Sequence, residues 1–204
     1  MATRTRNAGR TAFLPPEAIA FLKRRAKELA GMVILICAAA LTVAVIGYDS
    51  TDPSWNHAVS RDASNPLGHA GAWVADALMQ SIGGAAILPG LILMVWGWRI
   101  ARHRDMGRSW LRVTAVPVAL LLSAVGLAAV GTPDAWPVKI GMGGVTGSVL
   151  LKHVGTLAFA AGIPLWSVAL VSEILAVAAL LAALGISRQE WSGGLRNAAQ
   201  ASGT

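Results

Sequence analysis

The run Leu29-Ala-Gly-Met-Val-Ile-Leu-Ile-Cys-Ala-Ala-Ala-Leu-Thr-Val-Ala-Val-Ile-Gly47 contains no charged side chain and decides the class of the fold. As an α-helix it would reach roughly 28 Å, which matches the hydrocarbon core of a bilayer. The whole chain agrees, because 55% of its 204 residues are hydrophobic and 13% are charged, whereas soluble domains carry about 25% charged residues. We therefore expect an all-α integral membrane protein.

Three further apolar runs indicate that the chain crosses the bilayer more than once. The expected spans cover residues 29–47, 77–98, 113–131 and 164–186. Within the second run, small residues permit close contact between helices. Pro89 is expected to kink that helix, because proline removes a backbone hydrogen bond. We therefore predict four transmembrane helices.

Residues 132–163 form an outer loop that contains a second helical pattern. From residue 145 to 163 the pattern is apolar, but Lys152 and His153 interrupt it. About 15 apolar residues remain, which is short for a transmembrane helix. We predict a short interfacial or re-entrant helix in the outer leaflet. A fifth span is the alternative, and it would place the C-terminus outside.

The basic residues lie mostly on one side of the expected spans. Residues 1–28 contain seven Lys and Arg and residues 99–112 contain five, whereas the outer loops 48–76 and 132–163 contain one and two. Because basic residues concentrate in cytoplasmic loops, four spans place both termini in the cytoplasm. The domains we expect are a basic N-terminus with a juxtamembrane helix (1–28), a membrane domain (29–187) and the start of a cytoplasmic linker (188–204).

We interpret the basic side chains beside the spans as determinants of topology that also contact lipid. They are Lys23, Arg24, Arg25, Arg99, Arg102, Arg104, Arg108 and Arg112.

Motifs of catalysis are absent from the sequence. It contains no Gly-x-x-x-x-Gly-Lys-Ser/Thr phosphate-binding loop, no Gly-x-Ser-x-Gly, no His-Glu-x-x-His and no Cys-x-x-Cys. His57 and His69 share the first outer loop with aspartates, but their spacing matches no pattern of metal ligands. We expect no enzyme activity, no metal and no cofactor.

Two carboxylates lie in or near the expected spans. Glu173 is inside the last span, where an ionised carboxylate would cost several kcal/mol. We expect it to be protonated or paired, and favour a packing or partner contact over proton transport because no second acid lies at that depth. Asp76 is expected in the first turns of the second helix, where it would cap the helix or contact the loop.

Three motifs stand at the outer ends of these spans: Asp52-Pro-Ser-Trp55, Asn65-Pro-Leu-Gly-His-Ala-Gly-Ala-Trp-Val-Ala-Asp76 and Gly143-Gly-Val-Thr-Gly-Ser148. Their order and spacing resemble the N-terminal membrane domain of the FtsK/SpoIIIE family of DNA translocases. Four spans and cytoplasmic termini also match that domain. The resemblance covers roughly residues 25–187.

This resemblance implies a membrane-anchoring and divisome-scaffolding domain in the bacterial inner membrane, placed at the division septum. In the family, partners are membrane lipid and divisome proteins, and the complete protein forms a hexameric ATP-driven motor that helps to segregate chromosomes. The linker and motor are absent from this sequence, so we expect part of a longer protein or a stand-alone paralogue. DNA would be contacted only through the motor.

We predict that partner binding or self-association uses two surfaces. The first is the outer loop with Asp52, Pro53, Ser54, Trp55, Trp73 and Asp76, and the second is the outer helix with Gly143, Gly144 and Gly147. Two alternatives belong to other classes. One is an accessory scaffold subunit of a respiratory or photosynthetic membrane complex, and the other is a small proton or solute transporter that uses Glu173.

Overall fold

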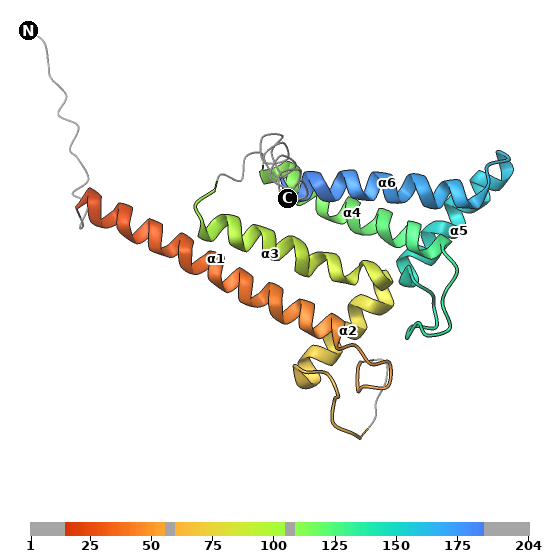
Figure 1. Cartoon of the computed structure of the whole chain (residues 1–204), viewed down its shortest axis with the longest axis horizontal. Helices are drawn as coiled ribbons and strands as arrows, with labels where there is room; N and C mark the ends of the chain where they lie inside the picture. Colours follow the sequence, from red (N-terminus) through yellow and green to blue (C-terminus); the bar gives the residue numbers. More distant parts are fainter. Residues whose placement is uncertain (1–14, 56–59, 105–108, 186–204) are drawn as a thin grey trace, which may run out of the picture.

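The computed structural model describes residues 15–55, 60–104 and 109–185, and every regular element in these ranges is a helix (Figure 1). The elements are α1 (Pro16–Ile46), α2 (Gly68–Ile82), the 3₁₀ helix η1 (Gly83–Ala86), α3 (Ile87–Ala101), α4 (Ser109–Ala129), α5 (Gly144–Ala160) and α6 (Leu165–Leu184). Four stretches of this described part are long and apolar enough to cross a bilayer: α1, residues 68–101, α4 and α6. The predicted all-α, four-span class is confirmed.

Helix α1 contains both the juxtamembrane helix and the first span. It begins at Pro16, in the first turn where a missing N–H costs no hydrogen bond, and Glu17 adds an acid at that positive helix end. Its 31 residues correspond to roughly 46 Å, which is longer than the hydrocarbon core. The helix therefore extends beyond the membrane core. The expected linker 188–204 and residues 1–14 lie outside the described residues.

The helices form two pairs, α1 with α3 and α4 with α6, which run side by side in Figure 1. Small residues make the first seam: Gly31 of α1 meets the backbone of Ala101, and Gly90 of α3 meets Thr42. Because lipid provides no hydrophobic drive between helices, such close contacts are what holds membrane helices together. The indole N–H of Trp96 in α3 links the two pairs by donating to the carbonyl of Ala183 in α6 at 2.9 Å.

The second span is broken, but not where we predicted. The expected kink at Pro89 is wrong, because Pro89 is the third residue of α3, where its missing N–H has no intrahelical acceptor to lose. The break is at η1, and it starts at Gly83, whose φ of +59° and ψ of −133° suit glycine. A Cβ there would collide with the carbonyl of Met142. The break thus seats the segment before α5 against the second span, where the Gly84 N–H donates to Met142 O at 2.8 Å.

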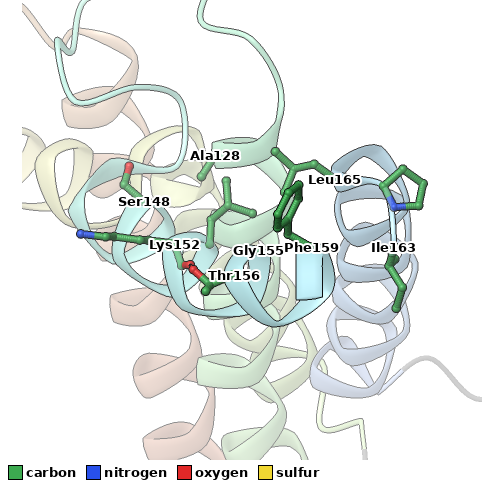
Figure 2. Close-up of a pocket in the computed structure, with 10 residues that line it drawn as sticks. Ala128, Ser148, Lys152, Gly155, Thr156, Phe159, Ile163 and Leu165 are labelled. Carbon is green, nitrogen blue, oxygen red and sulfur yellow. The ribbon is translucent and has the colours of Figure 1, made fainter. Parts of the chain in front are cut away.

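Helix α5 covers one end of the bundle. It contacts α4, α2 and η1, and it runs crosswise to the spanning helices (Figure 2). It is not one of the four stretches that are long and apolar enough to span. This arrangement supports the prediction of an interfacial helix, while its depth in the bilayer stays a prediction.

A small apolar core lies at the same end of the bundle. Buried Val45 from the end of α1, Met79 from α2, Ala86 from η1 and Val138 from the second outer loop meet there. Tyr48 of the first outer loop and Trp136 of the second are partly buried against this core, so the core joins both loops to the helices.

Candidate interaction surface

The buried carboxylate of Asp52 holds the first outer loop together by accepting hydrogen bonds from other residues of the loop. The side chain is only 4% exposed. It accepts hydrogen bonds from the backbone N–H and hydroxyl of Ser64 at 2.8 and 2.7 Å, and from the Asn65 N–H at 3.0 Å. Arg61 reaches it at 3.3 Å. Burial alone would raise the pKa of Asp52, but these hydrogen bonds outweigh it and hold the pKa below its ordinary value.

Asn65 fastens the loop to the end of α1. Its side-chain amide donates to the carbonyls of Ala44 and Gly47, both at 2.9 Å, and its amide oxygen accepts from the Leu67 N–H at 3.1 Å. Ala44 belongs to the last turn of α1 and Gly47 follows its end, where backbone acceptors lack partners within the helix. Asn65 is 4% exposed, so this motif residue stabilises the loop rather than presenting a contact.

Tyr48 and Asp76 connect the loop to α2. The Tyr48 hydroxyl donates to Asp76 Oδ1 at 3.2 Å, and Gln80 donates to the same oxygen at 2.8 Å. Shielding from water, followed by the neighbouring Asp76 carboxylate, raises the pKa of Tyr48 to about 12. Because α2 begins at Gly68, Asp76 lies in its third turn and contacts the loop. The expectation that Asp76 lies in the first turns is wrong.

Trp55 and Trp73 are the exposed aromatic members of the predicted set. Their ring centroids lie 5.9 Å apart with planes tilted by 45°, which is a favourable geometry for aromatic pairs. Trp55 is 81% exposed and Trp73 is 44% exposed. Together they form an aromatic patch, which we call the Trp55–Trp73 patch, between the first outer loop, which carries Trp55, and helix α2, which carries Trp73.

The other predicted contact residues are more enclosed. Pro53 is buried and Ser54 is half-buried. Gly143 and Gly147 face the Ala124 carbonyl of α4 so closely that neither has room for a Cβ, and Gly144 adopts a φ of +63° beside Gly83. These three glycines therefore seat α5 on the bundle, and they do not themselves lie on an exposed surface.

A pocket of about 460 Å³ opens between the two outer loops. Tyr48, Asp76 and Gln80 form its wall on one side, and residues 137–140 with Lys139 form the other. Sequence reasoning passed over Gln80 and Lys139, because neither belongs to the quoted motifs and the two lie far apart along the chain. Only the contact between loops shows that they share a pocket.

Glu173 of α6 packs against Gly126 of α4, where glycine leaves room for the carboxyl group. Its Oε1 is buried and accepts no hydrogen bond from any described residue. Helix α6 contains no other acid. The described residues hold no group of three or more His, Cys, Asp or Glu that could bind a metal ion, and His57 lies outside them.

The described arginines between residues 99 and 112 lie at the end of the bundle away from the two outer loops, and they include buried and exposed side chains. Arg99 and Arg112 are buried, and Arg112 donates to the carbonyl of Gly185 at 3.2 Å, where α6 ends. Arg102 lies over the Trp98 ring at 4.5 Å. Arg104 is exposed, whereas Arg108 lies outside the described residues. Some of the predicted topology residues thus also close the ends of helices.

A basic pocket of about 490 Å³ lies between α1 and the end of α3. Lys23, Arg24, Lys27 and His103 line it. Glu28 joins the two helices by contacting His103 at 3.1 Å, and it also pairs with Arg24 and Arg25. The cations that face outward are suited to phosphate groups of lipid.

Comparison with known proteins identifies relatives over most of this chain. The model of the family described as the 4TM region of DNA translocase FtsK/SpoIIIE matches residues 23–194. A protein named DNA translocase FtsK from Azospirillum brasilense is 36% identical over 190 residues, which is 92% of this chain and 30% of the relative. Proteins of the same name from Bradyrhizobium diazoefficiens and Caulobacter vibrioides are each 37% identical over 68% and 77% of this chain, and 17% and 19% of theirs. No solved structure matches the chain.

Proposed function

Because the chain belongs to the family of four-transmembrane regions of the DNA translocases FtsK and SpoIIIE, we propose that it anchors such a translocase at the division septum and docks cell-division proteins there. The chain spans less than a third of the length of the relatives named above. Translocation of DNA, hydrolysis of ATP and assembly of a hexamer are therefore proposed for the whole protein, with the motor outside these residues.

The observation that carries the docking proposal is the Trp55–Trp73 patch. Exposed paired aromatics are typical anchors of protein interfaces, because they bury a large apolar area with few rotatable bonds. Trp55 follows closely after the buried, hydrogen-bonded Asp52, and Trp73 stands on helix α2, so little ordering cost remains to be met on binding. Asp52, Pro53 and Asp76 contribute by holding this surface in shape.

We propose that both termini face the cytoplasm. The support is the charge count, since residues 1–28 and 99–112 hold 12 of the 17 Lys and Arg. The patch then faces the periplasm, and the basic pocket between α1 and α3 faces the cytoplasmic leaflet. Anionic lipid there would contribute about 1 kcal/mol for each well-placed basic residue.

A photo-crosslinking amino acid at position 55 tests the docking function in dividing cells. We expect crosslinks to cell-division proteins from position 55 and far fewer from position 62, because Asp62 is an exposed residue of the same loop outside the aromatic pair. Equal crosslinking from both positions, or products that contain only subunits of respiratory or photosynthetic complexes, would contradict the proposal.

A further inference from the structure

A groove of about 700 Å³ lies where α5 crosses the end of α4 and the start of α6 (Figure 2). Most of its wall is apolar, with Leu151, Phe159 and Leu165 among the lining residues. Figure 2 places Lys152 and Ser148 toward one end, and Phe159, Ile163 and Leu165 toward the other. The groove therefore has an apolar part and a basic end.

The position of the groove relates it to the edge of the membrane. Helix α4 ends at Ala129 and α6 begins at Leu165, so the groove lies at the ends of two spans. Phe159 in its wall is 87% exposed, and Leu157 of the same helix is 72% exposed. In a membrane protein such side chains face lipid, so the apolar part of the groove opens toward acyl chains.

Lys152 supplies the charge of the groove. It is the single charged residue among the described residues that line the groove, and the sequence of α5 contains no acid. The hydroxyls of Ser148 and Thr156 already donate to the carbonyls of Ile140 and Lys152, at 3.3 and 2.7 Å. The ammonium group of Lys152, at the end of a flexible apolar stem, is therefore the group suited to an anion at the membrane edge.

We propose that this groove binds an anionic phospholipid, with an acyl chain along its apolar wall and the phosphate at Lys152. A soluble anion would leave the apolar wall without a partner. A zwitterionic phospholipid would bring its own cation close to Lys152, whereas a lipid with a net negative charge matches it. This inference depends on membrane insertion and not on the proposed septal role.

Native mass spectrometry of the purified chain, with phosphatidylglycerol or phosphatidylcholine added, tests the two parts of the groove separately. Lys152→Gln should weaken the preference for phosphatidylglycerol about fivefold, while Lys139→Gln, which removes a charge from the outer loop, should not. Gly155→Leu should weaken binding of both lipids by filling the groove. A Cβ at Gly155 meets only Leu165 Cδ1, at an ordinary 3.4 Å.

Photolabelling of the unmodified chain keeps the test independent of how the variants fold. Phosphatidylglycerol with a photoreactive acyl chain should label peptides within residues 148–165 with a higher yield than peptides from the other helices. Labelling of α1 and α6 with the same yield as residues 148–165 would overturn the proposal. So would equal lipid binding by all three variants and the wild type, or a loss of lipid preference in Lys152→Gln without any effect of Gly155→Leu.

Discussion

Asp52 and Trp55 belong to one four-residue motif, yet the structure gives them opposite environments. Asp52 is buried under hydrogen bonds from Ser64 and Asn65, whereas Trp55 is 81% exposed. The sequence marks both as unusual in an outer loop. The partners of Asp52, however, lie 9 to 13 positions along the chain, and the partner ring of Trp55 is Trp73 in the next helix. For this reason the motif could be predicted as important while its division into anchor and contact residues could not.

Replacing Asp52 with Asn should loosen the first outer loop. The amide cannot accept all the N–H and O–H groups that now point at the carboxylate, so the free energy of unfolding should fall by about 1–3 kcal/mol. Hydrogen exchange of residues 60–65 and thermal unfolding in detergent measure the effect. Asp62→Asn, which changes an exposed acid in the same loop, should have little effect, and equal destabilisation by both changes would contradict the anchoring role.

Protonation of the Asp52 carboxylate should destabilise the loop at low pH. Because the folded-state pKa of Asp52 lies below the ordinary 3.8, its contribution to stability is fully present above that value and is lost as the pH falls through the folded-state pKa. The protection of residues 60–65 against hydrogen exchange, measured relative to the intrinsic exchange rate at each pH, should therefore fall below pH 4 in the wild type. If the Asp52→Asn variant showed the same acid transition, the transition would belong to another group.

Tyr48 can be titrated directly, because it is the single tyrosine of the chain. The ultraviolet absorbance of tyrosinate should show a midpoint near 12 rather than the ordinary 10.0. With a raised pKa, the stabilising contribution is present below pH 10 and is lost as the pH rises through the folded value. Asp76→Asn should shift the midpoint only part of the way back, because shielding from water remains. A wild-type midpoint near 10 would show that the phenol is not held in this contact.

At the scale of helices, sequence periodicity and apolar length predict which helices form, but they do not predict where a spanning helix is interrupted. The spans and the short α5 follow from runs of apolar residues that any reader of the sequence can locate. The break at Gly83 does not, because glycine is needed there for a contact with Met142, which is far along the chain. Pro89 carries the usual signal of a kink, but its position in the first turn of α3 removes the reason for one.

Substitutions at these two positions should therefore differ in effect. Gly83→Ala forces a side chain into a backbone conformation that favours glycine and against Met142. It should therefore lower the free energy of unfolding by at least about 1–3 kcal/mol. Pro89→Ala should cost at most about 0.4–1 kcal/mol, through greater freedom of the unfolded chain. Thermal unfolding of the two variants in the same detergent compares them. A larger loss for Pro89→Ala would restore the proline kink as the main feature of this span.

For the whole molecule, the apolar runs predicted the four spanning stretches, while the side on which the termini lie, predicted from the distribution of basic residues, stays a prediction. Lys and Arg gather in residues 1–28 and 99–112, and the described part of the chain contains four stretches able to span a bilayer. The packing of α1 on α3 and of α4 on α6 was beyond the sequence, because apolar runs do not indicate which pairs meet. Nor could the sequence reveal the groove under α5, which exists only where three helices come together.

The proposed topology can be tested with cysteine labelling in intact cells. Cys37, the single cysteine, is first replaced by Ser. A cysteine introduced at Asp62 or Asp134 should then react with a membrane-impermeant maleimide added outside, and one at Arg102 should react only after the membrane is opened. These positions lie in the two outer loops and the inner loop of the proposed topology. The reverse pattern would place the Trp55–Trp73 patch in the cytoplasm and exclude periplasmic docking.

The central claim is that this membrane domain reaches the septum through the Trp55–Trp73 patch. The most direct measurement is fluorescence microscopy of the full-length protein in cells that lack another copy, comparing Trp55→Ala/Trp73→Ala with Trp166→Ala. Trp166 is 68% exposed but stands at the start of α6, away from the first outer loop (Figure 1). We predict that the double variant remains in the membrane but spreads around the cell, while the wild type and Trp166→Ala gather at the septum. Septal accumulation of the double variant at the wild-type level would contradict the account.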